Sequence, residues 1–174
     1  GTIGIPMPSS DVSIRDTEGN EVAIGERGEL CIKGPHVMPG YWRQEDANKE
    51  AFWSDGYLRS GDVAMISEDG YLTVVDRIKD MAIVSGFNVY PNEIEAVIAM
   101  MDEVVECACI GIPDDVTGEA VKLFVVKKDE NLTPDAIIEY ARKNLTAYKV
   151  PKHIEFRDEL PKSNVGKILR RELR

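Results

Sequence analysis

The sequence is poor in the residues that build metal centres and disulfide frameworks. It holds three cysteines and two histidines among 174 residues. The histidines, His36 and His153, lie far apart, so no ligand set has the spacing of a structural zinc site and we expect no metal. Cys107 and Cys109 alternate with apolar residues, which indicates small buried side chains on one face of a strand and suits a reducing cytoplasm.

Long apolar runs and an excess of positive charge are also missing. No stretch approaches the roughly 18 apolar residues of a membrane-spanning helix, and Gly1 to Gly4 do not resemble a charged, cleavable signal sequence. We therefore expect a cytoplasmic protein. The net charge is -10, which argues against nucleic-acid binding, because that affinity depends on neutralising phosphates with Lys and Arg. Any anionic ligand would have to be met by a few local cations.

The first part of the chain, residues 1–76, is predicted to be rich in β structure. Short segments of β-forming residues alternate with turns, and Asp69-Gly70 is typical of a hairpin turn. One helix is predicted at about residues 44–52. Trp42 and Trp53 are interpreted as packing anchors rather than as ligand-stacking rings.

The second part, residues 77–174, alternates helices with strands and predicts a compact α+β domain. A helix from Pro91 to Met101 has proline in its first turn and apolar residues at i, i+3, i+4 and i+7. Another helix follows the Thr133-Pro134 cap. A short hairpin or bent strand pair is predicted around Ser85-Gly86, and further strands are predicted at residues 104–112, 119–126 and 153–158.

Two glycines stand where they could serve a ligand. Gly61 precedes Asp62, and a carboxylate there can accept two hydroxyl hydrogen bonds, as a ribose diol would require, although a turn residue is the more frequent role. Gly86 has no Cβ, so another group can approach its backbone closely, although a turn glycine also explains the local pattern.

The C-terminal tail concentrates positive charge in an otherwise acidic chain. Its cations are Lys162, Lys167, Arg170, Arg171 and Arg174. One interpretation is a basic, solvated terminal helix with Ile168, Leu169 and Leu173 packing underneath. The other starts from Gly166, because a flexible backbone before Lys167 can present that long cation to a phosphate.

These places belong to five motifs that follow one another in a fixed order. The motifs are YLRSGD at 57–62, DRIKD at 76–80, SGFNVYPNEIE at 85–95, YKVP at 148–151 and LPKSNVGK at 160–167. Together they resemble the adenylate-forming superfamily of acyl-CoA synthetases, luciferase and peptide-synthetase adenylation domains. The residues of the motifs are most similar to those of the bacterial long-chain fatty-acid–CoA ligases.

The resemblance implies an acid–thiol ligase that converts a fatty acid, ATP and coenzyme A into acyl-CoA, AMP and pyrophosphate through an acyl-adenylate. It implies that residues 1–76 are the last β-rich, distorted-barrel piece of a large domain and that residues 77–174 are a small mobile lid. The phosphate loop, the residues that support Mg²⁺ and the acyl pocket would lie outside this chain. We therefore expect a C-terminal fragment that is inactive alone. Peripheral binding to the inner face of the membrane and a homodimer stay open for the full-length enzyme.

The resemblance also assigns roles to single residues of the motifs. Asp62 would hold the ribose hydroxyls, and Arg77 would contact the nucleotide near the ribose. Lys79 stands at the hinge position, where a few dihedral changes move a whole domain. Lys167 would neutralise charge on the carboxylate and phosphate during adenylation.

Ser85 and Gly86 would border the path of the pantetheine arm of coenzyme A in the second step. The sequence departs from the family at two nearby positions. Asp76 replaces a glycine that is common before the arginine of the hinge motif, and Ile83 stands where some relatives carry a lysine. No role is transferred to Ile83.

Two other functions stay open from the sequence. The first is an adenylate-forming enzyme with another substrate, such as an aryl- or medium-chain acyl-CoA ligase or a carrier-protein-loading adenylation domain. The second is a non-enzymatic binding module whose basic tail contacts a partner or an anionic surface. A binding module accounts for fewer of the sequence features than an adenylate-forming enzyme does. It leaves unexplained why Asp62, Arg77, Gly86 and Lys167 all stand where the family has functional residues.

Overall fold

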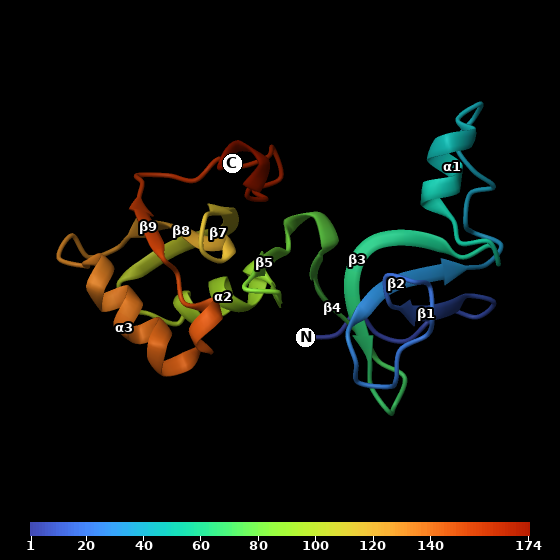
Figure 1. The fold of residues 1–174 in the computed structure, drawn as a ribbon, viewed down its shortest axis with the longest axis horizontal. Coiled ribbons are helices and arrows are strands. Elements are labelled where there is room, and N and C mark those ends of the chain that lie inside the picture. The colour runs from blue at the N-terminus through green and yellow to red at the C-terminus, as the bar shows by residue number, and fades with distance from the viewer. The chain divides into compact units, whose positions relative to one another are not determined.

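A computed structural model describes all 174 residues as two compact units, Gly1–Lys79 and Asp80–Arg174 (Figure 1). Strands and short helices occur in both, so the predicted α+β fold class is confirmed. The sequence placed the boundary slightly earlier, between Asp76 and Arg77. The roles of the two parts as a subdomain and a lid stay a prediction.

The first unit is built on one antiparallel sheet whose strands are neighbours in chain order. These strands are β1 (Asp11–Arg15), β2 (Gly28–Lys33), β3 (Leu58–Ile66) and β4 (Leu72–Arg77). The predicted turn at Asp69-Gly70 joins β3 to β4, and Ser67 N donates to Tyr71 O across it. A small apolar core lies on this sheet, formed by Ile14, Leu30, Ala64 and Leu72.

The helix predicted between β2 and β3 is present as α1 (Glu45–Ala51), and it buries no side chain. Trp53, just beyond it, donates from Nε1 to the Sγ of buried Cys31 at 3.3 Å, so its interpretation as a packing anchor is confirmed. The same interpretation is wrong for Trp42, which is 83% exposed. The Trp42 ring lies 5.4 Å from the Arg43 guanidinium instead of entering the core.

The second unit has a mixed sheet in the order β6-β5-β8-β7, with β9 added parallel to β8. Its strands are β5 (Ala82–Val84), β6 (Phe87–Val89), β7 (Val104–Asp114), β8 (Gly118–Lys127) and β9 (His153–Phe156). Two helices, α2 (Pro91–Ile98) and α3 (Pro134–Asn144), cover one face, and Figure 1 shows the C-terminal segment on the other.

The β7–β8 hairpin buries side chains on both of its faces, because successive side chains of a strand point in opposite directions. On the helix side lie Cys107 and Cys109, together with Val121, Leu123 and Val125. On the tail side lie Ala108, Ile110 and Phe124. The prediction that Cys107 and Cys109 share one buried face is confirmed. Burial, with the carboxylates of Glu95 and Glu106 nearby, raises the pKa of the Cys107 thiol to about 12.

The two predicted helices are present, and one ends earlier than expected. α2 stops at Ile98 because the chain tightens there, with Met101 N donating to Ile98 O. Met101 still enters the core, as its place in the apolar pattern predicted. α3 begins as predicted, since the Thr133 side chain accepts a hydrogen bond from Ala136 N at 3.3 Å. No helix has the length and apolarity needed to cross a bilayer.

The tail does not form the terminal helix that one interpretation predicted. An isolated bridge between Lys162 and Ile168 closes a loop, and a single 3₁₀ turn follows at Arg170–Glu172. Gly166, at φ +80°, reverses the chain in this loop, which excludes a continuous helix. The predicted packing of Ile168 and Leu173 is confirmed, since both contact the cluster on the tail side of the sheet.

Among the glycines of the second unit, Gly111 leaves the least space for an added side chain. A Cβ built on it would lie 2.6 Å from Ala82 Cβ and 2.9 Å from Glu119 Oε1. We expect Gly111→Ala to destabilise the second unit by about 1–3 kcal/mol, measured by urea unfolding followed by far-UV circular dichroism. Tryptophan fluorescence reports the first unit separately, because both tryptophans lie there. Adding Ala82→Gly should recover part of the loss, and an unchanged midpoint for Gly111→Ala would contradict the steric argument.

Candidate functional site

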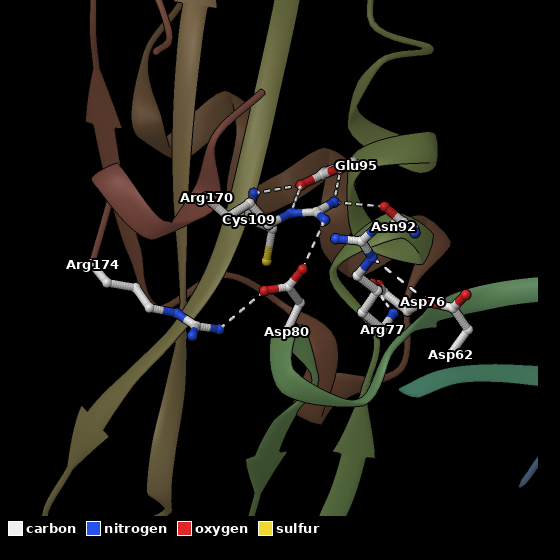
Figure 2. Close-up of polar contacts among 9 residues, drawn as sticks. All are labelled: Asp62, Asp76, Arg77, Asp80, Asn92, Glu95, Cys109, Arg170 and Arg174. Atoms are coloured by element: carbon white, nitrogen blue, oxygen red, sulfur yellow. Dashed lines mark hydrogen bonds and ion pairs between the residues drawn. The ribbon is translucent and has the colours of Figure 1, made fainter. Parts of the chain in front are cut away.

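The residues predicted to bind the nucleotide line one groove of the first unit. Asp62 and Arg77 are register partners across β3 and β4, and Arg77 Nε lies 3.6 Å from Asp62 Oδ1 (Figure 2). The groove has a volume of about 620 Å³, and its lining also includes Gly61 and Lys79. The structure therefore brings together three of the six predicted site residues, Asp62, Arg77 and Lys79.

An irregular stretch of β3 presents Asp62 to this groove. Gly61 has φ +75°, and the β2–β3 register shifts between Glu29 and Cys31. Glu29 supports the irregularity from the neighbouring strand, since its carboxylate accepts from Arg59 Nε at 2.9 Å and from Gly61 N at 3.1 Å. Such irregularities change the direction in which a strand side chain points. Asp62 lies within β3, so it is a strand residue rather than a turn residue.

Glu29 is a residue that the sequence analysis missed. It is 7% exposed and ionically paired with Arg59, so it shapes the floor of the groove from inside the sheet. The available signal was a single acidic residue beside the apolar run Leu30 to Ile32 of the segment GELCIK. Buried carboxylates need partners, and this one has an arginine and a backbone N–H.

Asp76, one of the two departures from the family pattern, also has a clear structural place. It is 2% exposed, and its Oδ1 accepts a hydrogen bond from Arg77 N at 2.8 Å. The carboxylate thus fixes the backbone at the base of Arg77. A glycine could not make this contact, which gives the substitution a physical consequence next to the predicted nucleotide residue.

Lys79 closes the first unit. It lies in a one-turn 3₁₀ helix, Ile78–Asp80, that buries none of its residues. The boundary between the two compact units follows directly after it. A short exposed turn between two units is where a few dihedral angles can change without unpacking a core. The hinge role itself stays a prediction.

Ser85 and Gly86 form the turn of the β5–β6 hairpin, so the hairpin rather than the bent strand pair is present. Both have positive φ, +51° and +82°, as a tight two-residue turn of this kind requires. Two hydrogen bonds connect the hairpin to the segment around the start of β8: Ser85 N donates to Thr117 O, and Ile83 N donates to Glu119 Oε2. A Cβ added to Gly86 would meet no atom within 4 Å. The turn explains the glycine, and the open space leaves its backbone accessible.

Lys167 lies on the exposed loop of the tail. Its backbone N donates to Ser163 Oγ at 3.1 Å, and its side chain forms no ion pair with this chain. Lys162 differs, since its Nζ lies 2.8 Å from Glu106 Oε2, so the two lysines of the loop have different electrostatic surroundings. The long side chain of Lys167 is therefore the one available to an anion from outside.

Known protein families match both ends of the chain. A family described as AMP-binding enzyme matches residues 1–42, and one described as AMP-binding enzyme C-terminal domain matches residues 93–167. The chain is therefore similar to the AMP-binding enzymes over residues 1–42 and 93–167. This outcome confirms the resemblance inferred from the ordered motifs.

Members of this family from bacteria are similar along the whole chain. The long-chain-fatty-acid–CoA ligase of Yersinia pestis is 60% identical over 174 residues, which are 100% of this chain and 31% of that protein. The feruloyl-CoA synthase of Amycolatopsis is 43% identical over 175 residues, covering 100% of this chain and 35% of the synthase. The chain thus spans about a third of the length of the curated relatives it matches.

Solved structures of the family share the fold. ATP-bound MatB from Rhodopseudomonas palustris superposes with a TM-score of 0.95 at 37% identity, over 100% of this chain and 35% of MatB. The o-succinylbenzoate-CoA synthetase MenE from Bacillus subtilis, in complex with its acyl-adenylate intermediate, gives a TM-score of 0.88 at 32% identity, over 99% and 35% of the two chains.

The role given to Glu29 predicts that removing its carboxylate destabilises the first unit. Glu29→Ala would leave Arg59 and the Gly61 N–H without their acceptor, at a cost of about 1–3 kcal/mol. Urea unfolding followed by the fluorescence of Trp53, whose ring lies 4.5 Å from the Arg59 guanidinium, measures the loss.

Glu29→Gln should cost less, since the amide oxygen can still accept from Gly61 N. Glu68→Ala, in the exposed β3–β4 turn, is the matched control and should leave the unfolding midpoint unchanged. Equal midpoints for Glu29→Ala and the control would show that the groove does not depend on this carboxylate.

Proposed function

We propose that this chain works in an ATP-dependent long-chain fatty-acid–CoA ligase. The observation that carries the proposal is the 60% identity with the Yersinia pestis ligase along the entire chain. In the proposed reaction, a carboxylate oxygen attacks the α-phosphorus of ATP and the bond to pyrophosphate breaks. The thiol of coenzyme A then loses its proton and attacks the acyl carbon, and AMP leaves.

The groove of the first unit supports a place for the nucleotide. Asp62 is an acceptor-only carboxylate with its side chain 36% exposed, so lone pairs remain for the two hydroxyls of a ribose. Arg77, 48% exposed beside it, would contact the nucleotide near the sugar. Mg²⁺ would arrive on the phosphates of ATP, and we propose no magnesium ligand among the residues of this chain.

We propose that the second unit is a lid with a separate role in each step. Lys167 would stabilise the charge that develops as the carboxylate attacks, which is an electrostatic role for a positioned cation. Rotation at Lys79 would then exchange the face presented to the acyl-adenylate. The Ser85-Gly86 turn would border the pantetheine arm, because the space beside Gly86 is open.

An aryl acid is the second candidate for the substrate. The 43% identity with the feruloyl-CoA synthase of Amycolatopsis favours it over a medium-chain acid, although it is well below the 60% identity with the Yersinia pestis ligase. Both candidates use the same lid chemistry. Acyl-CoA formation by the full-length enzyme from a panel of fatty and aryl acids tests which class it accepts.

Replacing Lys167 tests the first step. In the full-length enzyme, Lys167→Ala should slow pyrophosphate release about 100-fold or more, because a preorganised charge that meets transition-state charge is lost. The same variant supplied with preformed acyl-adenylate should make acyl-CoA at nearly the normal rate. Lys162→Ala is the control from the same loop, and it loses only a half-exposed pair with Glu106. Equal damage to both steps would remove Lys167 from the proposed role.

Replacing Gly86 tests the second step. Gly86→Leu should spare acyl-adenylate formation and block transfer to coenzyme A, because the added side chain fills the open space beside the turn. The strain of a side chain at positive φ needs its own control. Gly70→Leu provides it, since Gly70 also has φ +82° and no atom within 4 Å of an added Cβ. If both variants lose the two half-reactions alike, the effect is turn strain alone.

A further inference from the structure

Arg170 lies at the centre of a polar cluster in the second unit (Figure 2). Its guanidinium contacts Glu95 through two bonds, from Nε to Oε1 at 3.1 Å and from Nη2 to Oε2 at 2.7 Å. Nη2 also donates to Asn92 Oδ1 at 2.5 Å, and Nη1 lies 3.7 Å from Asp80 Oδ2. The Arg170 side chain is 16% exposed. A two-bond contact fixes the direction of the guanidinium as well as its distance.

Glu95 connects this arginine to the rest of the fold. It belongs to α2, and its Oε1 also accepts the backbone N–H of Cys109 in the edge strand β7 at 2.7 Å. The helix, the strand and the tail therefore meet at one carboxylate, which is 18% exposed. Since Glu95 and Arg170 are 75 residues apart, the contact joins distant parts of the unit.

Asp80 connects the tail to the beginning of the unit. It is the first residue of the unit and directly follows Lys79. Its carboxylate lies 3.7 Å from Arg170 Nη1 and 3.4 Å from Arg174 Nη2, and its side chain is 14% exposed. The residue beside the proposed hinge is thus tied to the segment that carries Lys167.

We infer that Arg170 is a positioning residue for Lys167. It follows Lys167 in the same segment, and it ties that segment to α2 through Glu95 and to the start of the unit through Asp80. The loop of Lys167 is exposed, so its placement depends on such anchors at its base. Lys167 would then move with the lid as one body when the hinge turns. This inference rests on the proposed function.

Arg171 provides a control that distinguishes the effect of net charge in the tail from the effect of the Arg170 contacts. Its side chain is 80% exposed, and its ion pair is with adjacent Glu172 at 3.7 Å. Exposed pairs of this kind contribute little, whereas removing one partner of a largely buried pair leaves the other charge without compensation. Arg170→Gln and Arg171→Gln remove the same charge from consecutive positions.

The first measurement does not depend on activity. Hydrogen exchange of the full-length protein, followed by mass spectrometry, compares the tail (residues 160–174) with strand β8 (Gly118–Lys127). Arg170→Gln should raise exchange in the tail about tenfold or more, because Lys167 N and Leu169 N lose protection with the anchor. Exchange in β8 should not change. Arg171→Gln should leave both segments as in the wild type.

The second measurement uses the two half-reactions. Arg170→Gln should slow adenylation about 10- to 100-fold, as expected when a reacting group is misplaced, with little change in the KM for ATP. Thioester formation from preformed acyl-adenylate should stay close to normal. Arg170→Lys should restore adenylation only in part, because an ammonium cannot replace the planar two-bond contact with Glu95. The double variant with Glu95→Gln should be no slower than Arg170→Gln, since the two residues act as one unit.

Three outcomes would overturn the inference. Unchanged exchange in the tail of Arg170→Gln would show that the arginine does not hold it. Faster exchange in β8, with both half-reactions equally slow, would mean a general loss of structure. Arg171→Gln matching Arg170→Gln would mean that net charge alone is responsible. If the wild-type enzyme makes no acyl-CoA, the proposed function is wrong, and the exchange data alone decide whether Arg170 anchors the tail.

Discussion

The second unit depends on the burial of both faces of the β7–β8 hairpin. Cys109 and Leu123 point toward the helices, while Ile110 and Phe124 point the other way, so apolar surface is exposed on both sides unless two layers cover it. α2 and α3 supply one layer. The tail must supply the other, through Leu160 and Leu173 among others. The apolar residues on either side of the Lys167 loop are therefore part of the core, although the loop itself is exposed.

The charges of this acidic chain follow the same division between structure and site. Glu29 and Glu95 are largely buried, and each is bound by an arginine and a backbone N–H. The pair of Asp62 and Arg77 is much more exposed and its atoms are 3.6 Å apart. A pair like this adds little stability, so a ligand could displace it at small cost. The buried ion pairs therefore fix the fold, and the exposed charged side chains remain available to bind a ligand.

The sequence predicted the elements whose determinants are local. The apolar spacing of α2, the Thr133 cap and the alternation around Cys107 each involve residues within a few positions of one another, and all are confirmed. The terminal helix predicted for the tail was wrong, because the shape of the tail depends on the distant Phe124 face of the sheet. The partners of Glu29 and Glu95 could not have been found from local patterns, since one is an arginine on the next strand and the other is an arginine 75 positions away. The candidate site residues were therefore predicted from the family resemblance, whereas the residues that hold them in place were found only in the structure.

The three glycines singled out in the motifs show why resemblance alone does not give a mechanism. Gly61, Gly86 and Gly166 all have positive φ, and none has an atom within 4 Å of an added Cβ. Backbone conformation therefore explains each glycine without a ligand. What differs is the neighbour that each turn presents. Gly61 is followed by Asp62 in a groove and Gly166 by Lys167 on an open loop, so their chemistry lies in those side chains. Gly86 presents only bare backbone, and any role it has must come from the space it leaves.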